Sequence, residues 1–135
     1  MAERYFLDTF FVQAILNSAD AYHKQALQWK AVLYQSELWV TQAALIEVGN
    51  ALGKTKRTVA ADFIAGCYSA PNIHVVAISP ELFQRGLSLY RSRPDKEWGL
   101  TDCLSFVVMT EQQLLLALTG DHHFTQAGFT SLLSS

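Results

Sequence analysis

Hydrophobic positions along the chain form short unbroken runs, separated by longer stretches in which apolar residues recur with helical spacing. The short runs predict buried strands at residues 5–7, 38–40, 73–77 and 114–118. The longer stretches predict helices at residues 21–34, 43–52, 59–68, 81–90 and 102–111. Alternating strands and helices favour a mostly parallel sheet with helices on both faces. We therefore predict the α/β class, as a single three-layer domain over residues 1–135.

Residues that favour helix N-termini precede four of the predicted helices. Asp20, Thr41, Ser79 and Thr101 can each cap the helix that follows, and Pro80 suits the first turn after Ser79. These signals support the helix assignments independently of hydrophobic spacing.

The composition narrows the class of protein. Half of the residues are hydrophobic and 16% are charged, which excludes a disordered chain. No apolar run is long enough to span a bilayer, and Asp8 comes too early for a signal peptide, so we expect a cytoplasmic protein. Cys67 and Cys103 lack metal-ligand spacing and are expected to be buried, reduced thiols. The mean hydropathy of +0.14 favours an apolar surface for a partner or a second copy.

Two carboxylates follow predicted strands, and two lie on predicted helices. Asp8 and Asp121 come after the first and last strands, where ligands bind in open α/β sheets. Asp102 lies in the first turn of a helix, where the helix dipole favours an ionised carboxylate. Glu47 flanks an apolar helical stripe, so we expect poor access to water and a positive partner.

Each of these acids also has a structural interpretation. Asp8 can cap a following helix, Asp121 can cap residues 122–127, Asp102 can be an ordinary helix-start acid, and Glu47 can be a paired surface acid. Their convergence on one crevice favours a metal site. Hard oxygen ligands suggest Mg²⁺ or Mn²⁺ and not Zn²⁺. With four acids bound to metal, the formal charge of the remainder changes from −2 to +2, so net charge does not exclude a nucleic-acid substrate.

Four stretches that contain these acids resemble the PIN domain, the nuclease fold of VapBC-type toxins. They are FLDT at 6–9, ALIEV at 44–48, LTDCLSF at 100–106 and ALTGDHHF at 117–124. The end of the chain, QAGF at 126–129 with Leu132 and Leu133, also resembles the family's last turn and strand. The resemblance covers essentially the whole chain, with all four acids in order.

The resemblance implies a PIN-like fold and a metal-dependent endoribonuclease. Asp8, Glu47, Asp102 and Asp121 would be both the catalytic residues and the ligands of one or two Mg²⁺ or Mn²⁺ ions. Thr9 and Thr119 match hydroxyl positions that support the acids. The expected role is the toxin of a toxin–antitoxin pair, with an RNA substrate and a small antitoxin protein as partner.

Other chemistry-bearing residues leave alternatives open. Asp95 resembles part of one subgroup's lead-in and is either a fifth site acid or a solvated loop acid; that subgroup usually has Ser where this chain has Gly99. His122 and His123 are adjacent, so their side chains are expected to point apart, toward packing or phosphate-side contacts.

Two basic groups are candidates for RNA contacts. The first comprises Lys54, Lys56 and Arg57. Lys54 would lie two helical turns beyond Glu47, roughly 10 Å along the axis. The second group comprises Arg91, Arg93 and Lys96. A solvated basic turn is the alternative for the first group.

Competing functions are an inactive PIN-fold module that binds RNA or protein, and two phosphotransfer classes. A haloacid-dehalogenase-type enzyme needs a second Asp where this chain has Phe10, and a phospho-receiver domain needs a lysine after a late strand. A homodimer is predicted from residues 59–68, which carry several small residues that allow close helix contact: Ala60, Ala61, Ala65 and Gly66.

Overall fold

A computed structural model of the protein describes residues 2–134. Five parallel strands form its central sheet. The strands are β1 (Arg4–Leu7), β2 (Glu37–Thr41), β3 (Ile73–Val76), β4 (Leu116–Leu118) and β5 (Thr130–Ser131). Their order is β3-β2-β1-β4-β5. Strands form at all four predicted positions, but β3 is not the buried strand that was predicted, because its four residues are half-buried or exposed. β4 is shorter than predicted, because Leu115 is 66% exposed and precedes the sheet.

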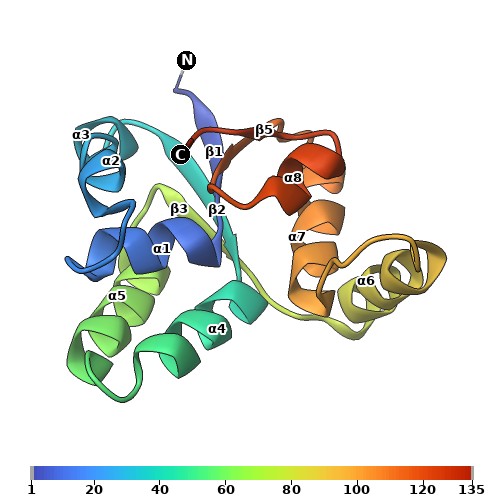
Figure 1. The fold of residues 1–135 in the computed structure, drawn as a ribbon, viewed down its shortest axis with the longest axis horizontal. Helices are drawn as coiled ribbons and strands as arrows, with labels where there is room; N and C mark the ends of the chain where they lie inside the picture. Colours follow the sequence, from blue (N-terminus) through green and yellow to red (C-terminus); the bar gives the residue numbers. More distant parts are fainter. Residues whose placement is uncertain (1, 135) are drawn as a thin grey trace.

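Helices cover both faces of this sheet, which confirms the three-layer α/β prediction (Figure 1). The helices are α1 (Thr9–Leu16), α2 (His23–Leu27), α3 (Lys30–Leu33), α4 (Gln42–Leu52), α5 (Arg57–Ser69), α6 (Pro80–Ser92), α7 (Leu100–Glu111) and α8 (His122–Gln126). In Figure 1, α1, α2, α3 and α5 lie on one side, and α7 and α8 lie on the other. α6 packs on the outer side of α7.

The core is divided by the sheet, because successive strand residues face opposite sides. In β1, Tyr5 and Leu7 join the cluster under α1 and α5, whereas Phe6 joins the cluster under α7 and α8. In the second cluster the Phe106 and Phe124 rings meet edge to face, with centroids 4.9 Å apart. α7 and α8, which both start at the candidate site, are therefore anchored in one aromatic core.

Three helix predictions need correction. The predicted helix 21–34 is two short helices, α2 and α3, separated where the Trp29 ring packs edge-on against Tyr5 with centroids 5.6 Å apart. Asp20 therefore forms a turn before α2, accepting a 2.8 Å hydrogen bond from the Tyr22 amide, and is not the cap. α7 begins one residue before Thr101, with Gly99 as its N-cap.

α1 was not among the helices predicted from hydrophobic spacing. Its sequence, TFFVQAIL, is nearly all apolar and therefore has no helical period. The predicted caps Thr41 and Ser79 are confirmed. Each hydroxyl oxygen accepts a hydrogen bond from the backbone amide three residues later, at 3.1 Å for Thr41 and 3.0 Å for Ser79. Pro80 occupies the first turn of α6, as predicted.

The chain order of the strands places a topological switch point at β1. β2 and β3 extend the sheet on one side of β1, and β4 and β5 extend it on the other. The Asp8 amide donates to the Leu118 carbonyl at 3.3 Å, so the carboxyl ends of β1 and β4 lie together. Ligands bind at such points in parallel sheets. The fold therefore positions its site beside Asp8.

Both cysteines are buried and free, as the sequence predicts. Within residues 2–134, no helix combines the length and apolar character needed to cross a membrane.

Candidate active site

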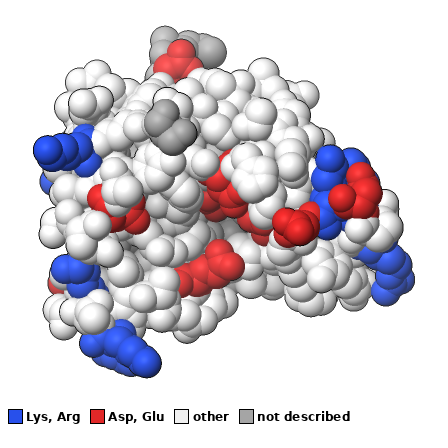
Figure 2. Space-filling view, viewed as in Figure 1, with Lys and Arg blue, Asp and Glu red and all other residues white. Residues whose placement is uncertain are grey.

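An open cleft of about 470 Å³ lies at the carboxyl edge of the sheet. Its lining includes all four acids singled out in the sequence, and five further residues: Thr9, Phe10, Gln13, Asp20 and His123. Figure 2 shows acidic side chains gathered in a hollow near the middle of this face, with Lys and Arg side chains toward its edges. The structure therefore brings Asp8, Glu47, Asp102 and Asp121 together from four separate segments.

Asp8 links β1 to α1 at the bottom of this cleft. It is 5% exposed, and its Oδ2 accepts hydrogen bonds from the Thr119 hydroxyl at 2.7 Å and the Phe10 amide at 3.4 Å. Burial raises the pKa of the Asp8 carboxyl to about 7; the Thr119 hydrogen bond opposes the rise, and the charges of Asp102 and Asp121 add to it. Without a cation, Asp8 is therefore hard to ionise.

Asp121 and Asp102 lie at the starts of α8 and α7, on the other side of the sheet from α1. Asp121 caps α8, with its Oδ1 accepting from the His123 amide at 2.9 Å. Asp102 Oδ2 accepts from the Gly99 amide at 3.0 Å in the first turn of α7. Burial raises the pKa of Asp102, the Gly99 hydrogen bond lowers it, and the charge of Asp121 raises it.

Thr119 connects two of the acids. It is fully buried, its hydroxyl donates to Asp8, and its Oγ1 accepts a 3.0 Å hydrogen bond from the Asp121 amide. Thr9 has a corresponding position beside the fourth acid: its hydroxyl donates to Glu47 Oε1 at 2.9 Å. The positions of both threonines agree with the supporting role that the resemblance implies.

Glu47 differs from the expectation in its surroundings. The expected poor access to water is wrong, because Glu47 is exposed. Its hydrogen-bond partner among residues 2–134 is the neutral Thr9 hydroxyl, and a positive partner for Glu47 stays a prediction. The buried stripe of α4 includes Leu45, Val48 and Leu52. Glu47 lies outside that stripe and faces the open cleft.

The hydrogen bonds of the four carboxylates share one feature that bears on metal binding. Each acid uses a single oxygen for all its contacts: Oδ2 in Asp8 and Asp102, Oδ1 in Asp121, and Oε1 in Glu47. The second oxygen of each accepts no hydrogen bond from residues 2–134. Among the residues of that range that are not exposed, Trp39 Nε1 is the single fully buried and unpartnered side-chain nitrogen or oxygen, so the second oxygens of Asp8, Asp102 and Asp121 reach solvent. Glu47 is itself an exposed residue. Four accessible carboxylate oxygens in one cleft are a donor set that fits Mg²⁺ or Mn²⁺.

His123 lies in the cleft beside two of the acids, whereas the sequence predicted only packing or phosphate-side contacts for it. Its Nδ1 lies 3.0 Å from Asp102 Oδ2 and 3.4 Å from Asp121 Oδ1. The expectation that the two histidines point apart is wrong, because their ring centroids are only 4.6 Å apart; His122, however, is mostly exposed. Asp121, His122 and His123 place one ligand atom each within 4.8 Å of one another. The signal available in the sequence was a histidine two residues after a capping Asp.

Two other acids have clear positions. Asp20, singled out only as a helix signal, is a fifth carboxylate in the cleft lining. Asp95 is not in that lining: both of its oxygens accept hydrogen bonds from the Arg93 guanidinium at 2.9 Å. These contacts lower the pKa of Asp95 to about 2, and its side chain is 58% exposed. Asp95 is thus the solvated loop acid of the two alternatives.

The first basic group lies away from the cleft lining. α4 ends at Leu52, so Lys54 is in the following turn and not on the helix face of Glu47, as the sequence argument assumed. Arg57 Nε donates to the Gly53 carbonyl at 3.2 Å, so that it helps to terminate α4. Lys56 precedes α5 as its N-cap residue.

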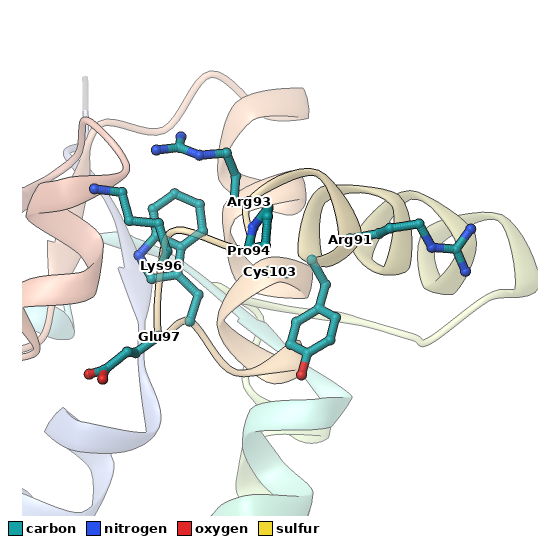
Figure 3. A pocket seen from close by; sticks show the side chains of 8 residues that line it. Arg91, Arg93, Pro94, Lys96, Glu97 and Cys103 are labelled. Atoms are coloured by element: carbon teal, nitrogen blue, oxygen red, sulfur yellow. The ribbon is translucent and has the colours of Figure 1, made fainter.

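The second basic group lines a separate pocket of about 430 Å³, beside α6 and the start of α7. Figure 3 shows the Arg91 guanidinium directed away from Arg93 and Lys96. Arg93 also lies over the Trp98 ring, 5.1 Å from its centroid, and is paired with Asp95. Arg91 therefore does not share an anion with Arg93 and Lys96, whose charges both act on Asp95.

The fold is similar to that of two VapC-type toxin–antitoxin proteins of known structure. The VapC20 toxin of Mycobacterium tuberculosis, described as cleaving the sarcin-ricin loop, is similar over 95% of this chain and 98% of its own, with 22% sequence identity and a TM-score of 0.85. The VapBC2 structure from Rickettsia felis, bound to a DNA fragment from its promoter, matches over 97% of this chain and 98% of the other, with 12% identity and a TM-score of 0.66.

At these identities the likeness shows the fold. No family model matches the sequence, and no curated protein sequence matches it. The PIN resemblance inferred from the four motifs is thus confirmed by the three-dimensional structure.

Proposed function

We propose that this chain is a divalent-metal-dependent endoribonuclease that cleaves RNA phosphodiester bonds and acts as the toxin of a toxin–antitoxin pair. The observation that carries the proposal is the set of four accessible carboxylate oxygens, one from each acid, at the switch point of the sheet. The structural likeness to a toxin described as cleaving the sarcin-ricin loop supports RNA as the substrate.

Asp8, Glu47, Asp102 and Asp121 would hold one or two Mg²⁺ or Mn²⁺ ions. When bound, such ions supply an activated water and neutralise charge on the scissile phosphate. The protein's contribution is to fix the acids: Thr119 orients Asp8, Thr9 orients Glu47, and His123 orients Asp102. The acidic cleft repels RNA until cations are present, so substrate binding should depend on the metal.

RNA contacts outside the cleft are proposed at Lys54, Lys56 and Arg57. These residues follow α4, which also carries Glu47. Lys54 and Arg57 are exposed, so both can contact backbone phosphates of a longer RNA. Such contacts would raise affinity without reading sequence.

Two protein partners are proposed, a second copy of the chain and a small antitoxin. The antitoxin rests on the likeness to the Rickettsia felis VapBC2 structure. For the homodimer, large apolar side chains are exposed across α4 and α5: Ile46 57%, Val59 44% and Tyr68 57%. Ala60 is 2% exposed and packs inside the protein, so it takes no part in that surface. Light scattering of purified protein should show a dimer; a monomer that captures no partner would contradict both.

The test of activity is RNA cleavage by purified protein in Mg²⁺ or Mn²⁺, and in EDTA. We expect cleavage that EDTA abolishes, and loss of cleavage in Asp102→Asn, since Asn keeps the shape but not the charge. Asp95→Asn is the matched control, because Asp95 lies outside the cleft and should leave cleavage unchanged.

Two results would contradict the proposal. If EDTA left the cleavage activity of the purified protein unchanged, the metal-dependent mechanism would be excluded. RNA binding without cleavage in either metal would favour the alternative function, an inactive PIN-fold module that binds RNA or protein.

A further inference from the structure

α1 has a fully buried face and a second face that reaches the cleft, on which Phe10 is only partly buried against the core. Phe11, Val12 and Ala14 are buried, whereas Phe10 and Gln13 line the acidic cleft. Positions three residues apart lie on the same helix face, with about 4.5 Å of rise between them. Phe10 and Gln13 therefore form a continuous strip beside the carboxylates.

The Phe10 ring is held in place at this strip. It makes an edge-to-face contact with Tyr22, with centroids 4.8 Å apart and planes at 69°. The ring also packs against Gly120. A Cβ at position 120 would lie 2.6 Å from Phe10 Cζ, so the ring occupies the space that a side chain at this position would need. The ring is only partly buried. The result is a fixed aromatic surface in a cleft otherwise lined by polar and charged side chains.

Gln13 supplies a polar group beside that ring. Its side-chain amide makes no hydrogen bond with any residue from 2 to 134, whereas Thr9, Asp8 and Glu47 in the same lining are all hydrogen-bonded. A carboxamide has two donor hydrogens and an acceptor oxygen. An amide and an aromatic ring together match the two needs of an unpaired base, which stacks on aromatic rings and forms hydrogen bonds through its edge.

We propose that Phe10 and Gln13 form a nucleobase subsite next to the four carboxylates. The base of a nucleotide adjoining the cleaved phosphate stacks on Phe10, and Gln13 forms hydrogen bonds with its edge. Glutamine pairs best with adenine, which presents an amino donor beside a ring-nitrogen acceptor. This inference rests on the proposed function for its RNA substrate, and it assigns the preference for one base to α1.

The test uses short single-stranded RNA that carries the fluorescent adenine analogue 2-aminopurine, whose emission is quenched by stacking. Binding is measured in Ca²⁺, which takes oxygen ligands and neutralises the acidic cleft. We expect quenching by the wild type. Phe10→Leu should lose the quenching and weaken binding roughly 5- to 100-fold, as loss of one base–aromatic stack does.

Gln13→Ala should keep the quenching, because the ring remains, and should weaken binding of adenine-containing RNA roughly 2- to 10-fold. It should also remove the preference for adenine at that position. The matched controls are Phe83→Leu and Gln84→Ala on α6, which is outside the cleft lining; they should behave as the wild type. Thermal unfolding checks that Phe10→Leu is folded, and Gln13→Ala gives an independent test on a helix position that tolerates Ala.

The outcomes separate the subsite from the nuclease. No quenching by the wild type, equal quenching by Phe10→Leu, or an unchanged base preference in Gln13→Ala would each overturn the subsite. Quenched binding without cleavage in Mg²⁺ or Mn²⁺ would support the subsite and overturn the nuclease. Cleavage that is unaffected by either α1 variant would do the reverse.

Discussion

Replacing Asp8 by Asn should stabilise the metal-free protein at neutral to alkaline pH while removing the proposed ribonuclease activity. The Asp8 carboxyl is 5% exposed, and burial raises its pKa to about 7 from an ordinary value of 3.8. Because the folded protein binds this proton more tightly than the unfolded chain, Asp8 contributes full stability below the unfolded pKa. That contribution is lost as pH rises through the folded pKa of about 7.

The magnitude follows from the shift. Each pKa unit corresponds to about 1.4 kcal/mol, so ionising Asp8 costs about 4 kcal/mol in total, of which roughly 2–3 kcal/mol falls between about pH 5 and about pH 8. Asn is neutral throughout this range. It also remains a good cap for α1, since Asn and Asp are nearly equivalent at the N-cap position. The variant should therefore lack this part of the pH dependence.

The assay is urea unfolding of wild type and Asp8→Asn in EDTA, at about pH 5 and about pH 8, repeated with Mn²⁺. In EDTA the free energy of unfolding of the wild type should fall between the two pH values, and that of the variant should fall less. Mn²⁺ at a hundred times its dissociation constant should stabilise the wild type by about 2.7 kcal/mol, and the variant by less.

A variant that is less stable than the wild type at the higher pH in EDTA would refute the reasoning, above all if Mn²⁺ also left the wild type unchanged. In that case Asp8 would act only as a helix cap, and the metal site would lose its physical basis.

The other predictions concern the support of the site and the packing between helices. Thr119→Val removes the hydroxyl that donates to Asp8 and should lower metal affinity or cleavage roughly 10- to 100-fold, measured by titration and RNA cleavage; unchanged values would contradict its role. Gly86→Ala places a Cβ 2.5 Å from the buried Leu104 side chain and should cost about 1–3 kcal/mol in urea unfolding. Gly66→Ala meets no atom within 4 Å and should be neutral or stabilising by up to about 1 kcal/mol, so equal effects of the two would count against the packing argument.

β1 and β2 were predictable because burial on both faces of a sheet leaves unbroken apolar runs, and each contains such a run. β3 lies at the edge of the sheet, and its run is interrupted by the exposed His74. An unbroken apolar run also prevented the prediction of α1. Its buried face is apolar, and Phe10 on its cleft side is apolar too, so the sequence of this helix has no helical period. The break between α2 and α3 lies at Trp29, whose ring packs edge-on against Tyr5. Contacts of this kind join residues distant in sequence, and hydrophobic spacing does not contain them.

Asp8, Asp102 and Asp121 were predictable from their places at strand ends and a helix start, and Glu47 from its place beside an apolar helical stripe, but their surroundings were not. Glu47 was expected to have poor access to water and is exposed. The helical period shows which face of the helix carries a residue, but it does not show which part of the protein that face meets. His123 could not be assigned, because its contact with Asp102 spans 21 residues and depends on how α7 and α8 pack. The free amide of Gln13 likewise becomes visible only when the cleft is formed.

Helix capping and metal binding are compatible roles for these acids, although the sequence makes them look like alternatives. Asp8 and Asp121 each cap a helix, and Asp102 bonds to the amide before α7, as the structural interpretation required. In every case one oxygen makes those contacts, which leaves the other directed to solvent in the cleft. The backbone amides thereby fix the carboxylate's rotation before any ion arrives, and a fixed ligand loses less conformational freedom on binding. In the proposed metal site, a capping acid at a strand end would thus be a preorganised ligand, and the cap would be part of how the fold builds that site.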